Sequence, residues 1–105
     1  IDFEDFTKMD IRVGKILEAE KHPKADRLLK LLVDTGVDKR TIVSGIAEHY
    51  EAEKVIGKTV SVLMNLAPRK IRGIESHGMI LMAEDDKTLQ FVSPESDLTP
   101  GSEIR

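Results

Sequence analysis

The stretch Asn65–Met79 reads N-L-A-P-R-K-I-R-G-I-E-S-H-G-M and lies between two apolar segments. Apolar residues occupy alternate positions before it, as in a half-buried strand, at Val60, Val62 and Met64. Pro68 has no N–H to donate to a neighbouring strand, so we expect the ladder to end there. The apolar run Met79–Met82 then begins a new strand. The sequence therefore predicts a strand, a polar loop and a second strand.

The polar loop is cationic. Arg69, Lys70 and Arg72 lie within four residues, and no acidic residue precedes Glu75. A run of charge is often only a solvated surface. The run at Arg69–Arg72, however, has no obvious use in a core. Its position in a loop between two strands indicates a surface that binds an anion.

The charge of the chain is segregated along the sequence. The formal net charge of the 105 residues is −3, which does not fit a protein that coats nucleic acid generally. From residue 84 to residue 105, two bases stand against six acids: Glu84, Asp85, Asp86, Glu95, Asp97 and Glu103. A local positive surface can therefore exist on an acidic protein.

Composition excludes several classes of protein. The chain has no cysteine, and its histidines (His22, His49 and His77) lack the spacing of a zinc site, so we predict no metal and no cofactor. No phosphate-binding glycine motif and no catalytic constellation is present. No apolar run is long enough to span a membrane, and there is no secretory leader, which favours a cytoplasmic protein.

Hydrophobic periodicity along the rest of the chain predicts the other elements. The length allows one domain, residues 1–105. We expect a short helical turn at Ile1–Met9 with Asp2 as its N-cap, and a turn-rich tail after Pro94. The remaining expected elements are strands at Asp10–Glu20, Arg27–Asp34, Arg40–Ser44, Lys58–Asn65, Met79–Ala83 and Thr88–Val92, and a helix at Ala47–Ile56 that closes at Gly57.

The first strand changes phase along its length. Ile11 and Val13 face inward, and the inward position then shifts to Ile16. Because Gly14 lies at the shift, we expect a bulge or a bend there, which would let one strand serve both halves of a small barrel.

Three strands, a helix and two further strands, in this order, are typical of an OB-fold. This is an all-β, five-stranded, partly open Greek-key barrel, with the helix between strands 3 and 4. Here the two ends of the chain add further elements. An SH3-like barrel is the alternative, but such a barrel does not normally carry that helix.

The motifs also resemble a known family. The stretch N-L-A-P-R-K-I-R-G followed by S-H-G-M is very similar to the motif of the tRNA-binding domain appended to many methionyl-tRNA synthetases. D-I-R-V-G, H-P-K-A-D and R-T-I-V-S-G-I match the same family in the same order, at Asp10–Gly14, His22–Asp26 and Arg40–Ile46. The resemblance covers the chain from about Phe3 to Ile104.

Two groups of residues are candidates for binding RNA. The resemblance implies that the tRNA site is lined by Asn65, Arg69, Lys70, Arg72, Ser76 and Met79. A second basic group lies on a turn and strands that would flank the same face, at Lys24, Arg27, Lys30 and Arg40. Lys30 and Arg40 could equally be solvent-exposed charges on the strands. Ser44 could be a turn residue at the end of a strand or a contact to the nucleic acid.

Aromatic residues are scarce, and this bears on the kind of RNA. The chain has four, Phe3, Phe6, Tyr50 and Phe91, and none lies on the middle strands. Proteins of this fold that bind single strands stack successive bases on aromatic side chains. Folded RNA, recognised by its shape, phosphates and 2′-hydroxyls, is the better match.

These observations predict a non-catalytic tRNA-binding domain that belongs to a methionyl-tRNA synthetase and acts beside its catalytic part. The start at Ile1 instead of Met suggests a piece of a longer chain. The alternatives are a free-standing tRNA-binding protein, a purely structural dimerisation module, and an export-related chaperone homologue that binds polypeptide.

Self-association is a further expectation. Three of the four aromatics lie in two pieces outside the five-strand core, and clustered apolar surface often marks an interface. The resemblance also implies a homodimer. We expect a contact at or near Phe3, Phe6, Leu89 and Phe91, unless these pieces pack on their own barrel.

Overall fold

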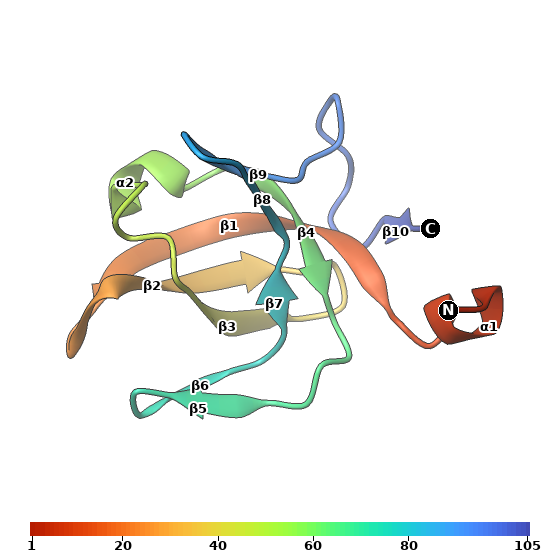
Figure 1. Ribbon diagram of the computed structural model, residues 1–105, viewed down its shortest axis with the longest axis horizontal. Coiled ribbons are helices and arrows are strands. Elements are labelled where there is room, and N and C mark those ends of the chain that lie inside the picture. Colours follow the sequence, from red (N-terminus) through yellow and green to blue (C-terminus); the bar gives the residue numbers. More distant parts are fainter.

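The long strand β1, Ile11–His22, crosses the whole molecule in the computed structural model, which describes all residues from 1 to 105 (Figure 1). It belongs to a curved antiparallel sheet in the order β3-β2-β1-β4-β7. The other elements are α1 (Phe3–Phe6), β2 (Ala25–Asp34), β3 (Lys39–Ser44), α2 (Ala52–Val55), β4 (Thr59–Leu63), β5 (Arg69–Ile71), β6 (Ile74–Ser76), β7 (Met79–Ile80), β8 (Met82–Glu84), β9 (Leu89–Phe91) and β10 (Glu103–Ile104).

The strand β1 serves both halves of the barrel, as predicted. Its first part, Ile11–Lys15, pairs with β4, and the part from Lys15 to His22 pairs with β2. The barrel closes where the segment after β6 meets β3, since the amide N–H of His77 donates to the carbonyl oxygen of Thr41 at 2.9 Å. The five strands and the position of α2 confirm the predicted OB-fold order.

Gly14 has a different role from the predicted bulge. Its pairing with β4 is regular, and the two irregularities of β1 lie in the pairing with β2, between Ile16 and Glu18 and between Lys21 and His22. A Cβ atom at Gly14 would lie 2.9 Å from Cγ2 of Val62 and 3.0 Å from Cγ1 of Val33. The glycine is needed because two strands pack too closely for a side chain.

The core fills the barrel. Leu29, Leu31 and Val33 of β2 face inward and are fully buried, which confirms the alternation expected from the sequence. The buried cluster consists of Ile16, Leu29, Leu31, Val33, Ile42, Ile46, Val55, Val60, Val62, Met64 and Ile80. Each such side chain stabilises the fold by about 1.5–3 kcal/mol relative to its exposure.

The helix between β3 and β4 is shorter than predicted. Only α2 is helical, and the first half of the expected Ala47–Ile56 helix forms a turn in which the N–H of Tyr50 donates to the carbonyl oxygen of Ile46. The Tyr50 hydroxyl donates to the carbonyl oxygen of Leu89 at 2.7 Å. This contact ties the segment to β9, and Glu51, in an extended conformation, separates the turn from α2.

Two elements at the C-terminal side also differ from expectation. The predicted strand Met79–Ala83 is interrupted at Leu81, whose N–H donates to the carbonyl oxygen of Ser61. Because Ser61 belongs to β4, this bond still ties Leu81 to that strand. From Met82 onward the chain leaves β4 and β8 pairs with β9, so the predicted Thr88–Val92 strand forms a hairpin. The tail contains the short strand β10, which pairs with the start of β1.

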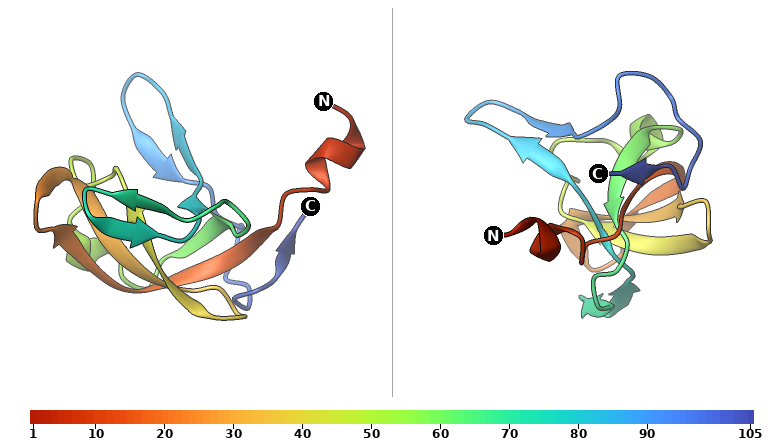
Figure 2. Two further views of the ribbon diagram at one scale, coloured as in Figure 1. Left: turned by 90° about the horizontal axis from the view of Figure 1, so that it is seen from below. Right: turned by 90° about the vertical axis from the view of Figure 1, so that its right-hand side faces the viewer.

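Figure 2 shows α1 standing clear of the barrel, next to the point where β10 ends the chain. Asp2 precedes α1 as its N-cap, and its N–H donates to Oδ2 of Asp5 at 3.1 Å. None of the helices is both long and apolar enough to cross a membrane.

Candidate nucleic-acid interface

The cationic stretch is a β-hairpin and not the loop that the sequence predicted. Strands β5 and β6 pair in the register Arg69↔Ser76, Lys70↔Glu75 and Ile71↔Ile74. At the tip, Arg72 and Gly73 both have positive φ angles, of 52° and 91°. Two central residues with positive φ are typical of the tight turn that matches the twist of a hairpin. The three cations are therefore held on a regular scaffold.

The hairpin is fixed against the β1–β2 turn by a buried histidine. Nδ1 of His22 accepts the N–H of Lys24 at 3.0 Å, and its Nε2 lies 3.2 Å from the carbonyl oxygen of Ile71. A neutral ring with its proton on Nε2 satisfies both contacts. Nη2 of Arg72 also donates to the carbonyl oxygen of Lys24 at 3.2 Å. Two segments about 50 residues apart thus form one basic surface.

The three hairpin cations are accessible to a ligand. Arg69, Lys70 and Arg72 are exposed, and none forms an ion pair. Glu75, which faces Lys70 across the hairpin, instead lies 2.8 Å from Nε2 of His77. Arg69 and Lys70 also have no side-chain hydrogen bond, so they can neutralise phosphates without first breaking a contact, whereas Arg72 keeps its bond to the Lys24 carbonyl oxygen.

The residues of the second basic group, Lys24, Arg27, Lys30 and Arg40, lie in different environments. Lys24 joins the hairpin as described, whereas Arg27 lies 3.4 Å from Glu48 and Lys30 lies 3.6 Å from Glu20. These two contacts are between largely exposed side chains, which contribute little to stability. The structure does not bring Arg27 or Lys30 to the hairpin.

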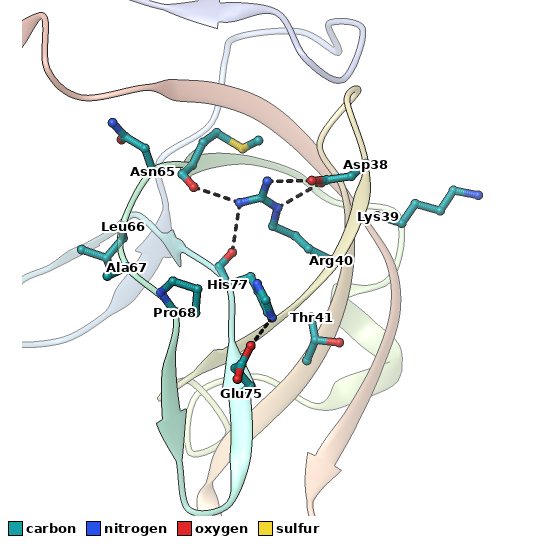
Figure 3. Close-up of a pocket in the computed structure, with 11 residues that line it drawn as sticks. Asp38, Lys39, Arg40, Thr41, Asn65, Leu66, Ala67, Pro68, Glu75 and His77 are labelled. Carbon is teal, nitrogen blue, oxygen red and sulfur yellow. Dashed lines mark hydrogen bonds and ion pairs between the residues drawn. The ribbon is translucent and has the colours of Figure 1, made fainter.

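Arg40 lies in an internal network, which Figure 3 shows. Its Nε and Nη2 donate to the two carboxylate oxygens of Asp38, and its Nη1 donates to the carbonyl oxygen of Met64 at 2.9 Å. Hydrogen bonds from Arg40 and from Thr35 lower the pKa of Asp38 from 3.8 to about 2. This network ties β3 to the segment that leads into the hairpin, so Arg40 positions that segment.

Asn65 and Ser76 also have internal partners. The Asn65 amide donates to the carbonyl oxygen of Lys8 at 2.7 Å and accepts the N–H of Asp10 at 2.9 Å, which fixes the link between α1 and β1. Ser76 is buried, and its hydroxyl accepts the N–H of Val43 at 2.9 Å. Both side chains therefore hold neighbouring segments in position and use their polar groups within the protein.

Two grooves border the hairpin. The larger, of about 600 Å³, is drawn in Figure 3 and is lined by Asp38–Thr41, Met64–Pro68, Glu75 and His77. The other, of about 350 Å³, brings together four predicted site residues, Ser44, Arg69, Ser76 and Met79. Sequence reasoning missed His22 and Leu66 as part of this surface. The H-P-K-A-D turn was visible in the sequence, but nothing there indicated its contact with the hairpin.

The residues proposed for self-association lie in two different environments. Phe3 is 78% exposed on α1, with its ring centroid 6.4 Å from that of Phe6. Phe91 instead packs on Tyr50, with ring centroids 4.9 Å apart, and Leu89 packs against the core. The second piece thus covers its own barrel. No group of three or more potential metal ligands is present.

His22→Ala should destabilise the domain by about 1–3 kcal/mol, because it leaves the Lys24 N–H and the Ile71 carbonyl without their buried partner. The loss should also speed amide hydrogen exchange within β5 and β6. Urea denaturation and exchange measured by NMR would check both effects. His49→Ala, at an exposed position, is the matched control. Unchanged hairpin exchange in His22→Ala would contradict the proposed fixing role.

The barrel and its cationic hairpin, whose three cations form no ion pair, define a nucleic-acid-binding domain of the OB-fold class. Residues 11–103 match the sequence profile of the family described as "Putative tRNA binding domain". The chain belongs to this family of tRNA-binding domains.

The chain is also similar in sequence to parts of methionine–tRNA ligases. The chain is 64% identical over 96 residues to a methionine–tRNA ligase of Christiangramia forsetii, and 62% identical over 105 residues to that of Flavobacterium johnsoniae. These matches cover 90% and 99% of this chain, but only 14% and 15% of the relatives. The chain thus spans about a seventh of the length of these ligases.

Solved structures share the whole fold. A protein of Pyrococcus horikoshii related to methionyl-tRNA synthetase superposes with a TM-score of 0.93 at 34% identity, covering 100% of this chain and 97% of that one. The chaperone CsaA of Bacillus anthracis superposes with a TM-score of 0.89 at 25% identity, covering 100% and 98%.

Proposed function

We propose that this domain is the non-catalytic appendage with which a methionyl-tRNA synthetase holds the outside of a folded tRNA in the cytoplasm. The observation that carries this proposal is the hairpin β5–β6, whose backbone is held at Ile71 and whose three cations are exposed and form no ion pair. The identity to methionine–tRNA ligases supports the choice of synthetase.

Binding would act through phosphates. Arg69 and Arg72 can each form paired hydrogen bonds to a phosphate, and Lys70 adds a point charge. Lys24 extends the same surface from the β1–β2 turn. Because the scaffold is a regular hairpin pinned by His22, little conformational entropy is lost when the RNA arrives.

The appendage would help its synthetase by adding a second contact to the same tRNA. A tethered second contact is effectively intramolecular and raises the overall affinity without any change in the first. The domain needs no strong sequence preference for this purpose, since the catalytic part selects the tRNA.

Shape recognition predicts how RNAs compete. Different elongator tRNAs should compete within about a few-fold of one another, whereas polyuridine of equal length should compete poorly, since no row of aromatic side chains lies beside the hairpin. Filter-binding competition at fixed salt would measure this. Strong binding of polyuridine would contradict shape recognition.

Two alternatives each have a supporting observation. The Pyrococcus protein is nearly the size of this domain, which favours a free-standing tRNA-binding protein. The likeness to CsaA favours a chaperone that binds polypeptide. Titration of the domain with bulk tRNA and with an unfolded peptide, each at two salt concentrations, would separate RNA binding from polypeptide binding. Preference for the peptide would overturn our proposal.

We also infer a homodimer in which the two copies contact each other through α1, and not through the β9 residues Leu89 and Phe91. Ile1, Phe3 and Met9 are exposed apolar residues at the N-terminal end, and α1 stands clear of the barrel in Figure 2. Leu89 and Phe91 are unsuited to the test, because Phe91→Asp would place a charge against Tyr50 and disrupt the barrel itself.

Sedimentation equilibrium should therefore find a dimer that Phe3→Asp converts to a monomer, since two charges would be buried at the contact. Val37→Asp, also at an exposed apolar position, is the matched control and should remain dimeric. A monomeric wild type at tens of micromolar would remove the homodimer, and a dimeric Phe3→Asp would remove α1 as its contact.

A further inference from the structure

An apolar groove lies directly beside the cationic hairpin. It has a volume of about 350 Å³ and opens between the end of β3, the strand β7 and the strand β5. Ligand pockets of proteins run from about 300 to 1,000 Å³, so this one has room for a small planar group and not for a large ligand. Of the residues that line it, most are apolar, one is cationic and none is acidic.

The walls of the groove expose apolar area to water. Leu66 is 40% exposed and Met79 is 44% exposed, and both line the groove. A ligand that covered these two side chains would gain their burial without displacing any internal contact. Met79 is also flexible enough to adapt to the face of a flat ring.

Two polar groups at the groove have no partner in the protein. The Ser44 hydroxyl and the Arg69 guanidinium both line it, and neither forms a hydrogen bond or an ion pair within the chain. Gly45, next to Ser44, leaves the backbone accessible, since a Cβ atom there would meet only Leu28 at 3.9 Å. The groove is therefore apolar inside and offers hydrogen bonds and a positive charge at its edge.

We propose that this groove holds one unpaired nucleobase of the bound tRNA; the inference rests on the tRNA-binding function proposed above. The base would lie against Leu66 and Met79, with the Arg69 guanidinium over its face or on the adjoining phosphate. The Ser44 hydroxyl can donate or accept, so it would bond the edge of any base and discriminate weakly.

The charge of the surroundings selects this occupant over an apolar peptide. The groove opens onto the hairpin, which bears Arg69, Lys70 and Arg72 against a single acid, Glu75, which does not line the groove and lies 2.8 Å from Nε2 of His77. A base that enters the groove carries its phosphates onto these cations. A single groove accepts a single base, so the scarcity of aromatic side chains still argues against binding of an extended single strand.

The test compares the double variant Leu66→Ser/Met79→Ser with the control Val37→Ser/Leu98→Ser, which truncates exposed apolar residues outside the grooves. The probe is an unmodified elongator tRNA transcript. The double variant should bind about 10-fold more weakly, as expected for one lost base contact. Its slope of log K against log salt should not change, because no phosphate contact is removed. The control should bind as the wild type does.

Chemical footprinting gives the second readout. Dimethyl sulfate and carbodiimide should show one loop base that the wild type protects and that becomes reactive with the double variant, while the rest of the footprint persists. Thermal melting by circular dichroism checks that both variants are folded. Equal affinity and equal protection in the double variant would overturn the nucleobase site and leave the proposed function standing.

Failure of the function itself would look different. If the folded wild type did not bind the transcript at all, the proposed function would fall, and this inference with it. If an apolar peptide competed with tRNA for the wild type but not for the double variant, the groove would be a polypeptide site and the nucleobase proposal would be wrong.

Discussion

Replacing Arg69, Lys70 and Arg72 by alanine together should lower the affinity for bulk tRNA by about 100-fold at 50 mM salt and reduce the slope of log K against log salt by about two to three. Each cation that neutralises a phosphate releases about one counterion, so three lost contacts remove nearly three units of slope. The fold should persist, because all three side chains are exposed and none forms an ion pair.

The control for this experiment removes the same charge elsewhere. Lys15, Lys54 and Lys87 are exposed on β1, on α2 and in the β8–β9 turn, respectively, and their triple alanine variant should keep most of the affinity and of the slope. Filter binding at several salt concentrations provides both quantities. If the hairpin variant bound tRNA like the wild type, β5–β6 would not be the site.

Gly78→Ala should reduce the free energy of unfolding by about 3 kcal/mol, a large part of the roughly 5–15 kcal/mol of a typical domain. Gly78 has a φ angle of 107°, which an alanine rarely adopts, and a Cβ atom there would lie 2.7 Å from the carbonyl oxygen of Leu63. Leu63 pairs with Met79 in the sheet, so it cannot move away without weakening the pairing of β4 with β7.

Gly73→Ala separates the two causes. Gly73 also has a positive φ angle, of 91°, but a Cβ atom there would meet no other atom within 4 Å. This variant should lose only the conformational part, about 1 kcal/mol. Urea denaturation of both variants measures the difference. Equal losses would show that the close approach to Leu63 contributes nothing.

The sequence is a good guide where structure follows from a local pattern. The alternation of Leu29, Leu31 and Val33 predicts a strand with one buried face, because a strand alternates between core and solvent with period two. The order of strands then predicts the barrel. The cationic stretch is found for the same reason, since three charges with no acid nearby are visible along the chain.

The sequence is a poor guide where a contact joins distant segments. Arg40, Asn65 and Ser76 have hydrogen-bond partners between 24 and 57 residues away, and no local pattern records such contacts. The sequence predicts a loop in place of the hairpin because the hairpin tip requires Arg72 in a conformation unusual for arginine. That conformation is supported by the bond from Arg72 to Lys24, 48 residues earlier.

The pairing of β10 with the start of β1 brings the two ends of the chain together, which suits this domain to fusion with other proteins. Ile104 lies opposite Ile11, so the two ends of the chain leave the barrel side by side. In Figures 1 and 2 the termini lie at one end of the longest axis and the tip of the β5–β6 hairpin lies at the other. A host protein could be fused at either end without obstructing the hairpin, and exchange of one host for another would leave the cationic surface unchanged.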